Sequence, residues 1–303
     1  MNGVAGWAAV ALSTLVLAHT LPWVALSLLA LRRPRGRPVP SAMRLAVIVP
    51  AHDEEAGIGR TVASLQEAPF EPRPEIIVVA DNCGDATVEI ACDAGATVLE
   101  RRDALRRGKS FALDHGLGAL RARDVPPDAV VVVDADTTVS RDFFAAISAR
   151  LAAGDEAVQV YYEPAPSGAA IARLRRLALA LAHWARPLGM TRLGLGTGIK
   201  GNGFALSWRL AREGFAGKGL AEDASLTLAL ARQSIPVRFE PRATVSGEMA
   251  ASYAAASTQD RRWEGGRLAL APQALAVAVR ALVTGRVAAA AGALDVATLP
   301  LSP

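Results

Sequence analysis

Three short runs of apolar residues constrain the fold of this chain more than any other feature. They are LAVIVPA (45–51), EIIVVAD (75–81) and AVVVVDAD (129–136), and a stretch with helical periodicity follows each of them. Strands without polar alternation are covered on both of their faces. Such strands alternating with helices predict an α/β fold, with a Rossmann-like, mostly parallel sheet and helices on both faces.

Weaker signals add further elements to this frame. In the first half we expect helices at 58–68, 85–93 and 109–120, a helix capped by Ser140, and strands at 97–99 and 158–162. In the second half we expect helices at 171–186, 221–232 and through 258–267, and strands at 237–239 and 244–245. A glycine-rich stretch, GLGTGIKGNG (194–203), precedes a short apolar strand.

Acidic side chains follow three of the predicted strands: Asp53, Glu54, Glu55, Asp81, Asp134 and Asp136. In parallel sheets, ligands bind beyond the carboxyl ends of the strands. Asp134 and Asp136 are two residues apart at the end of a strand, so we expect them to point in similar directions. Paired carboxylates suit a hard divalent cation that also holds phosphate oxygens. A turn aspartate next to a helix cap explains the same D-x-D pattern equally well.

Three further positions have both a functional and a purely structural interpretation. Asp81 can accept hydrogen bonds from a base or ribose, or it can simply form a turn with its neighbours. Lys109 begins a predicted helix, where an ammonium group can bind a diphosphate or remain solvated. Asp223, which follows Glu222, can act as a general base or can stabilise the first turn of a helix.

Gln259, Arg262 and Trp263 lie at helical spacing (i, i+3, i+4) and therefore share one face. An arginine and a tryptophan together offer a phosphate clamp and a stacking surface for a sugar. An amphipathic helix at a membrane surface is the structural alternative, because both residue types are common there.

The positive charge of the chain is confined to its first part. The net charge is +4, and residues 1–44 contain five basic side chains and no acid: Arg32, Arg33, Arg35, Arg37 and Arg44. The rest of the chain has 28 basic and 29 acidic side chains. A basic face for nucleic acid is therefore not expected, and we predict no nucleic-acid partner.

The segment from Val4 to Leu31 contains no charged residue. Roughly 20 apolar helical residues cross a bilayer, so this segment is long enough to span one. A signal peptide would have a positive residue before a shorter apolar run. A core helix is rarely apolar on all sides. The arginines that follow mark the cytoplasmic side, so we expect a single N-terminal span in the cell inner membrane and the remaining domain in the cytoplasm.

The spacing of Arg280 and Arg286 in an Ala/Leu/Val-rich C-terminus predicts an amphipathic segment at the membrane interface. The expected division is an anchor and basic linker (1–44), a central domain (45–267) and this interfacial segment (268–303). The two cysteines, Cys83 and Cys92, fit a reducing compartment and are expected to be ordinary buried thiols.

Seven motifs in order make the chain similar to a known family. VIVPAHDEE, VVADNCGD, RGKSFAL, VVDAD, GNGFALS, LAEDASL and QDRRW, within residues 45–267, resemble the family 2 glycosyltransferases, which have the GT-A fold. The match is closest to the membrane-associated branch that includes cellulose, chitin and hyaluronan synthases. The resemblance implies inverting transfer of a sugar from a nucleotide sugar, expected to be a UDP-sugar, to a hydroxyl of a saccharide or lipid-linked acceptor at the cytoplasmic membrane face.

The resemblance also implies roles for individual residues. Pro50, Ala51 and Glu54 match the segment that lines the nucleotide pocket, and Asp81 matches the residue that holds the uracil or ribose. Asp134 and Asp136 match the ligands of Mg²⁺ or Mn²⁺ beside the diphosphate. Asp223 matches the general base. The remaining matches are the diphosphate clamp and acceptor site, Gln259, Arg262 and Trp263, and the family-like positions Lys109, Gly201, Asn202 and Gly203.

The chain departs from the family pattern at Ala221, where Thr is usual, and at Asp53, where Asn is commoner. Polymer synthases of this branch have several spanning helices, whereas one is expected here. Addition of one or few sugars, a membrane partner subunit, or further spans beyond the sequence would each account for this. A nucleotidyltransferase would carry a G-x-G-x-x-R-like loop where PAHDEE stands. A non-catalytic nucleotide-sugar-binding protein would not need Asp223.

Overall fold

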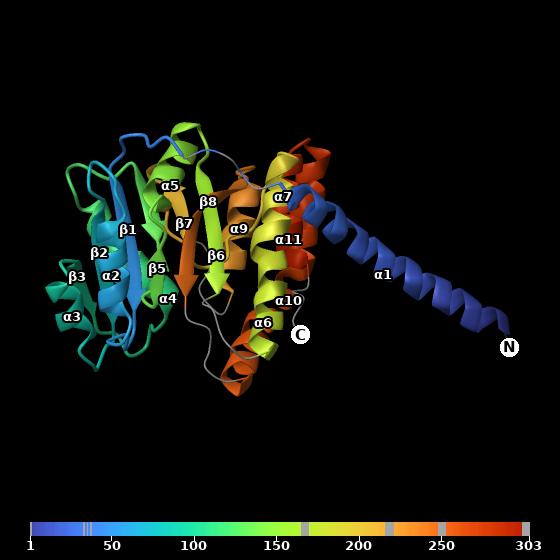
Figure 1. Ribbon diagram of the computed structural model, residues 1–303, viewed down its shortest axis with the longest axis horizontal. Helices are drawn as coiled ribbons and strands as arrows, with labels where there is room; N and C mark the ends of the chain where they lie inside the picture. Colours follow the sequence, from blue (N-terminus) through green and yellow to red (C-terminus); the bar gives the residue numbers. More distant parts are fainter. Residues whose placement is uncertain are drawn as a thin grey trace.

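One eight-stranded sheet organises the part of the chain that the computed structural model describes, which is residues 2–32, 34, 36, 38–164, 170–215, 221–247 and 253–298 (Figure 1). The strand order is β3-β2-β1-β4-β7-β6-β8-β5. The strands are β1 (Leu45–Ala51), β2 (Glu75–Asp81), β3 (Thr97–Arg101), β4 (Ala129–Val132), β5 (Thr137–Val139), β6 (Ala157–Pro164), β7 (Phe204–Ser207) and β8 (Val237–Gly247).

The two halves of the sheet differ in how neighbouring strands pair. Strands β3, β2, β1 and β4 are all parallel, as their apolar runs predict. Beyond them, β7 is antiparallel to both β4 and β6, β6 and β8 are parallel, and β5 is antiparallel to β8. The sheet is therefore mixed. Six of the eight strands of the described sheet run in one direction, as a mostly parallel sheet predicts, and the two that run the opposite way, β7 and β5, were not expected.

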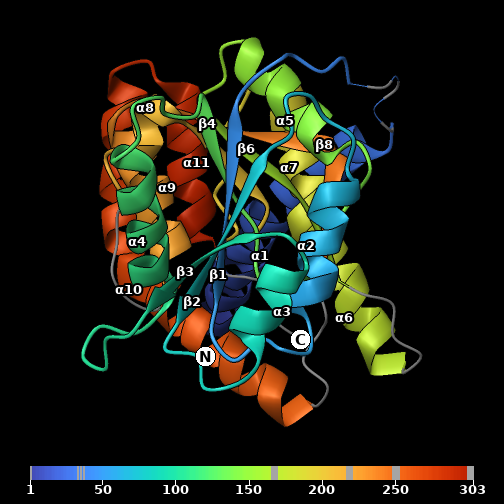
Figure 2. The same ribbon diagram turned by 90° about the vertical axis from the view of Figure 1, so that its left-hand side faces the viewer.

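Helices cover both faces of the sheet, as predicted (Figure 2). They are α1 (Asn2–Ala30), α2 (Ile58–Glu67), α3 (Thr87–Asp93), α4 (Lys109–Arg121), α5 (Phe143–Ala152), α6 (Ala170–Ala180), the π-helical turn η1 (Leu181–Ala185), α7 (Arg186–Arg192), α8 (Trp208–Ala211), α9 (Glu222–Arg232), α10 (Tyr253–Val283) and α11 (Val287–Ala297). Helices α2 and α5 pack on one face, and α4 and α9 on the other. On α2, Ile58, Val62 and Leu65 recur at helical spacing and are at most 1% exposed. Each buried side chain of this size stabilises the fold by about 1.5–3 kcal/mol.

The end of β4 differs from its predicted form. The strand stops at Val132, so Asp134 and Asp136 lie in the turn before β5 and not on a strand. The backbone N–H of Gly203 donates to the carbonyl of Val132 (3.1 Å), and that of Asp134 donates to a side chain, Asn202 Oδ1 (3.1 Å). The Asn202 side chain thus takes the place of a backbone partner from a neighbouring strand. Because Asp134 and Asp136 are not strand residues, strand geometry does not make their side chains point in similar directions.

Ser140 does not cap a helix. Helix α5 begins at Phe143, and Ser140 Oγ instead accepts a hydrogen bond from the backbone N–H of Thr244 in β8 (3.0 Å). The two short strands expected at 237–239 and 244–245 form one strand, β8, whose register against β6 shifts between Val160 and Tyr161. Pro241 lies in this bulge. Proline has no N–H to donate to a neighbouring strand, so within sheets it occurs at sites such as bulges, where that hydrogen bond is not required.

The helix expected at 171–186 is broken into α6, η1 and α7. The C-terminal part also differs from expectation, because Arg280 lies in α10 whereas Arg286 is the residue that precedes α11. The two arginines therefore do not form one polar helix face. Apolar residues of α9, α10 and α11 form a small core of their own, which includes Leu228, Ala278 and Ala293.

Helix α1 extends away from the sheet and its helices (Figure 1). Many of its described side chains are strongly exposed, among them Trp7 at 76% and Leu21 at 59%, whereas Ala30 at its C-terminal end is buried. Among the described residues, the segment long and apolar enough to cross a membrane is Gly265–Val283, most of which is exposed. The described apolar part of α1, Thr20–Ala30, is shorter than a bilayer requires. The N-terminal span therefore stays a prediction.

The two cysteines differ in environment. Cys83 is buried, as expected, but Cys92 is exposed on α3. Both are free thiols.

Candidate active site

The carboxyl ends of β1, β2 and β4 lie together at one edge of the sheet, because these neighbouring strands are parallel. Glu54 follows β1, Asp81 is the last residue of β2, and Asp134 follows β4. The topology therefore places three of the predicted acidic positions along the edge where α/β sheets bind ligands.

Asp81 is 4% exposed, and both of its carboxylate oxygens have partners. Oδ1 accepts hydrogen bonds from Arg101 Nη1 (2.5 Å) and Asn82 Nδ2 (2.9 Å), and Oδ2 accepts one from the backbone N–H of Gly108 (3.2 Å). Arg101 was not among the residues predicted from the sequence. The register pairs it directly with Asp81 across β2 and β3, and no signal in the sequence pointed to it, because the strand expected at 97–99 ends before Arg101.

Lys109, the first residue of α4, joins the end of β4 to the glycine-rich stretch. Its Nζ donates to Asp134 Oδ1 and to the backbone carbonyl of Gly201 (2.6 Å). The Lys109 side chain is 23% exposed and that of Asp134 35% exposed, so both remain accessible. Gly201 has a φ of +82°, which glycine adopts without strain.

Asn202 fixes the backbone of the D-x-D turn from the opposite side. Its Oδ1 accepts from the backbone N–H of Asp134, and its Nδ2 donates to Thr137 Oγ1 (2.8 Å). Thr137 Oγ1 in turn donates to Asp136 Oδ1 (3.2 Å). Neither Thr137 nor its contacts were predicted, because the partners are 65 residues apart in the sequence.

The carboxylates at this edge outnumber the cations. The pKa of Asp136 is raised, first by desolvation and then by repulsion from Asp134. The pKa of Glu54 is also raised, first by desolvation and then by the charges of Asp136 and Asp134. Desolvation also raises the pKa of Glu222, with Lys109 opposing the shift. Burial and the same two aspartates raise the pKa of Tyr162, another residue that sequence reasoning missed, to about 12.

Uncompensated carboxylates with accessible oxygens fit a divalent cation. Asp136 is exposed and Asp134 partly so, which leaves oxygen atoms free for a hard metal ion. Mg²⁺ is commonly held by one or two carboxylates and completed by substrate phosphates and water. Within the described chain, a group of three possible ligand atoms within 4.8 Å of one another is found at Asp53, Cys83 and Asp85. The carboxylates of that group are already bonded to the turn after β2, with Asp53 accepting from Gly84 N and Asp85 from Thr87 N.

Asp223 lies beside Gly201, in the first turn of α9. A methyl group added to Gly201 would be 3.9 Å from Asp223 Cβ. Asp223 is half-buried, and Glu222 next to it is close enough to Lys109 and Asp134 for their charges to act on its pKa. The structure therefore brings Asp134, Lys109 and Asp223 together around Gly201.

The remaining predicted residues are placed less completely. Pro50 and Ala51 end β1, with Ala51 only 3% exposed. Gln259, Arg262 and Trp263 lie in α10, but their side chains are outside the described part of the structure.

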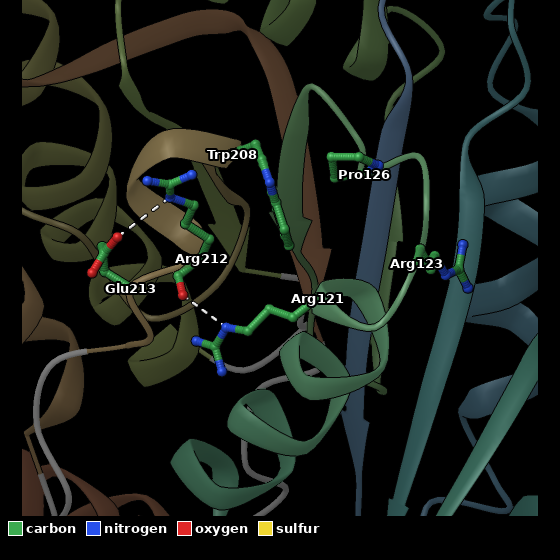
Figure 3. Close-up of a pocket in the computed structure, with 6 residues that line it drawn as sticks. All are labelled: Arg121, Arg123, Pro126, Trp208, Arg212 and Glu213. Carbon is green, nitrogen blue, oxygen red and sulfur yellow. Dashed lines mark hydrogen bonds and ion pairs between the residues drawn. The ribbon is translucent and has the colours of Figure 1, made fainter.

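A cavity of about 300 Å³ lies elsewhere, between the end of α4 and the β7–α8 connection (Figure 3). Arg121, Trp208 and Arg212 are among its lining residues, and Arg121 Nε donates to the carbonyl of Arg212 (2.7 Å). These residues flank the amino end of β4 and the end of the antiparallel β7, away from the turn that carries Asp134. None of the predicted site residues lines this cavity.

Comparisons with known proteins agree with the family resemblance of the motifs. The family described as "Glycosyltransferase like family 2" matches residues 41–266. The probable glycosyltransferase YdaM of Bacillus subtilis (strain 168) is 26% identical over 235 residues, which cover 74% of this chain and 55% of YdaM. The chain thus spans about half the length of this curated relative.

Two solved structures show the likeness of fold. The mannosyltransferase PcManGT from Pyrobaculum calidifontis, in complex with GDP-Man and Mn²⁺, has a TM-score of 0.61 at 19% identity, over 93% of this chain and 79% of that one. Glucosyl-3-phosphoglycerate synthase from Mycobacterium tuberculosis, with Mn²⁺, UDP and phosphoglyceric acid, has a TM-score of 0.52 at 21% identity, over 78% of this chain and 83% of that one. With the family match over most of its length and a GT-A-like mixed sheet, the chain belongs to glycosyltransferase family 2.

Proposed function

We propose that this enzyme transfers a sugar, with inversion, from a UDP-sugar to a hydroxyl of a saccharide or lipid-linked acceptor at the cytoplasmic face of the membrane. The observation that carries the proposal is the convergence of Asp134, Lys109 and Asp223 around Gly201. One sheet edge thereby offers carboxylates for a metal, a cation for phosphate and a carboxylate that can accept a proton.

Asp134 and Asp136 would hold Mg²⁺ or Mn²⁺. When bound, the metal would neutralise the negative charge that develops on the diphosphate leaving group. The exposure and the raised pKa of Asp136 support this role, as do structures of similar fold in complex with Mn²⁺ or Mg²⁺. Lys109 would add a second positive charge at the diphosphate, after exchanging part of its contact with Asp134.

The nucleoside would lie across the ends of β1 and β2. Pro50, Ala51 and Glu54 would line its pocket, and Asp81 would hold the uracil or ribose. Because Arg101 and Asn82 already orient the Asp81 carboxylate, its position would be set before the donor binds. GDP-Man accompanies the PcManGT structure, and a further structure of the Mycobacterium tuberculosis synthase, with a TM-score of 0.52, is in complex with UDP-glucose.

Asp223 would be the general base that takes the proton from the acceptor hydroxyl. The oxygen would then attack the anomeric carbon on the side opposite the diphosphate, which inverts the configuration at that carbon. Proton acceptance by a positioned carboxylate contributes about 10²–10⁴-fold to a rate. Gln259, Arg262 and Trp263 would clamp the diphosphate and contact the acceptor.

Helix α1 would anchor the enzyme through its uncharged N-terminal part. Trp7 and Leu21 are among its exposed apolar side chains, and the arginines after α1 would mark the cytoplasmic side. The C-terminal end of α1 is already held by the protein, because both terminal nitrogens of Arg192 donate to carbonyls there, those of Leu29 and Arg32.

The test is a screen of the full chain in membrane fractions. UDP- and GDP-sugars are supplied with Mn²⁺, and product masses are measured. We expect transfer from a UDP-linked glucose or N-acetylhexosamine that chelation abolishes. Asp223→Asn should lose at least about 100-fold in rate while still binding Mn²⁺ and UDP.

The matched control is Asp142→Asn, at the start of α5, which should keep full activity. Full activity in Asp223→Asn would remove the base from the mechanism. Product formed only from a GDP-sugar would overturn the choice of nucleotide.

A further inference from the structure

A buried ionic cluster lies behind the loop that ends at Gly201 and Asn202. Its centre is Asp295 of α11, which is 1% exposed. Asp295 Oδ1 pairs with Arg186 Nη2 (2.6 Å), and Oδ2 accepts from Lys200 Nζ (2.7 Å) and from the backbone N–H of Gly198 (2.8 Å). Arg267 Nη2 donates to the backbone carbonyl of Asp295 (2.9 Å). We call these residues the Asp295 cluster.

The cluster holds the same loop that shapes the candidate active site. Gly198 and Lys200, bonded to Asp295, immediately precede Gly201 and Asn202 in the sequence. From the sheet side, Gln159 completes the support: its Oε1 accepts from the N–H of Lys200, and its Nε2 donates to the carbonyl of Asn202, each at 2.8 Å. The loop is thereby held on one side by α11 and on the other by β6.

The cluster also joins the loop to the helix proposed to anchor the enzyme. The Arg186 guanidinium carbon lies 4.2 Å from the ring centre of Trp23 in α1. Next to it the backbones of α1 and α7 touch, because a methyl group at Gly189 would overlap the carbonyl of Leu26. Asp295 therefore bonds directly to α7, α10 and the loop, and it is linked to α1 through Arg186.

Stability alone does not account for a carboxylate at this position. Buried ion pairs are often replaced by apolar side chains without loss of stability, and the rest of the buried face of α11 is apolar. Burial opposes ionisation of Asp295, but Arg186 and Lys200 outweigh it and hold the pKa of Asp295 far below its usual value. The carboxylate thus stays charged and keeps its direction toward Gly198 and Lys200.

We propose that Asp295 is a positioning residue for the sugar transfer proposed above. By holding Gly198 and Lys200, it places the carbonyl of Gly201 against Lys109 and the amide of Asn202 against Asp134. It also makes this placement depend on how α1 is seated against Arg186. The proposal rests on the proposed function for its effect on turnover, but its effect on the Asp134 turn can be measured without substrate.

The experiment compares Asp295→Asn with Glu240→Gln in the full chain. Glu240 is a matched control because it is 0% exposed and bonded to two arginines, Arg150 (3.0 Å) and Arg242 (2.8 Å), without contact to the loop. Both variants are assayed well below their melting temperatures for Mn²⁺ affinity in the presence of UDP, for kcat and KM, and for hydrogen exchange of the Asp134 amide.

We expect Asp295→Asn to weaken Mn²⁺ binding and to lower kcat by about 10- to 100-fold, the range found when groups that orient metal ligands are removed. Exchange of the Asp134 amide should accelerate, whereas Glu240→Gln should change none of these quantities. Unchanged metal affinity and amide exchange in Asp295→Asn would overturn the proposal.

A second variant tests the same proposal in case Asp295→Asn does not fold. Gly198→Ala leaves every charge in place but directs a methyl group to within 2.7 Å of Asp295 Oδ2. It should reproduce the loss of metal affinity and the faster exchange, and wild-type values would also overturn the proposal. A wild type that transfers no sugar would reject the proposed function, while the exchange measurement would still decide the role of Asp295.

Discussion

Two charged regions flank the loop from Gly198 to Gly203, and they are balanced in opposite ways. On the sheet edge, Asp134, Asp136 and Glu222 face a single lysine, and the pKa values of Asp136 and Glu222 are raised. Behind the loop, one carboxylate meets three cations, and its pKa is lowered. In the first region the carboxylates lack a sufficient counter-charge until a cation is added, whereas in the second the carboxylate is already compensated by cations of the protein. This difference separates a place for ligands from a place that holds structure.

The largest effect on stability should come from removing the carboxylate of the compensated region. Asp295→Ala leaves Arg186 and Lys200 buried without their counter-charge, which should lower the free energy of unfolding by about 3–5 kcal/mol. Urea titration of the detergent-solubilised chain measures this change. A loss below about 1 kcal/mol would show that the Asp295 cluster is not the compensated region described above.

The same kind of change on the sheet edge should affect activity and not stability. Asp136→Asn removes a charge that its neighbours repel, so the melting temperature should stay the same or rise. Transfer should fall by about 100-fold, or about 2.7 kcal/mol of activation free energy, because a metal ligand is lost. Parallel melting curves and rate measurements with Mn²⁺ test both parts. If Asp136→Asn melted at a lower temperature but kept its transfer rate, the assignment of this region to ligand binding would be wrong.

The loop between the two regions should tolerate little change in its backbone. Gly203 has a φ of +64°, and a methyl group there would lie 2.7 Å from Val160 Cγ2 and Val245 Cγ2. Gly203→Ala should therefore cost about 1–3 kcal/mol in the free energy of unfolding. Gly118→Ala, in α4 where nothing lies within 4 Å of the added methyl, should be neutral or stabilising. Equal effects of the two substitutions would contradict this view of the loop.

The smallest effect should be the opposite response of the two regions to acid. The pKa of Asp136 is raised in the folded state, so its unfavourable contribution should fade as the pH falls through its folded pKa toward the unfolded value near 3.8. The pKa of Asp295 is lowered, so its stabilisation is present above the unfolded value near 3.8 and is lost as the pH falls further. Melting temperatures from pH 7 to 3 should show a slight rise and then a fall. Asp136→Asn should reduce the rise and leave the fall.

The first four strands could be predicted from sequence because each signal is local. β-branched runs such as 45–51 and 75–81 report burial on both faces, and parallel pairing then brings Glu54, Asp81 and Asp134 to one edge. The second half gave weaker predictions. The antiparallel direction of β7 and the break of 171–186 into three helical pieces depend on packing between distant segments.

The site shows the same division. Asp81 was recognisable at the end of a strand, but its partner Arg101 follows only from the register of β2 and β3. Asp134 was recognisable in D-x-D, yet its backbone is held by Asn202, 68 residues away. Side-chain partners at such separations leave no periodic signal in the sequence.

The sequence by itself determined the family, the parallel half of the sheet and the chemical character of its edge. Ordered motifs, strand periodicity and the residue types at strand ends carry these properties locally. Only the tertiary structure decided how the edge is supported. Lys200 and Asp295 are 95 residues apart in the sequence, and their contact exists because α11 packs against α9 behind the loop. Charge balance in a folded protein depends on distances in space, which the order of residues alone does not specify.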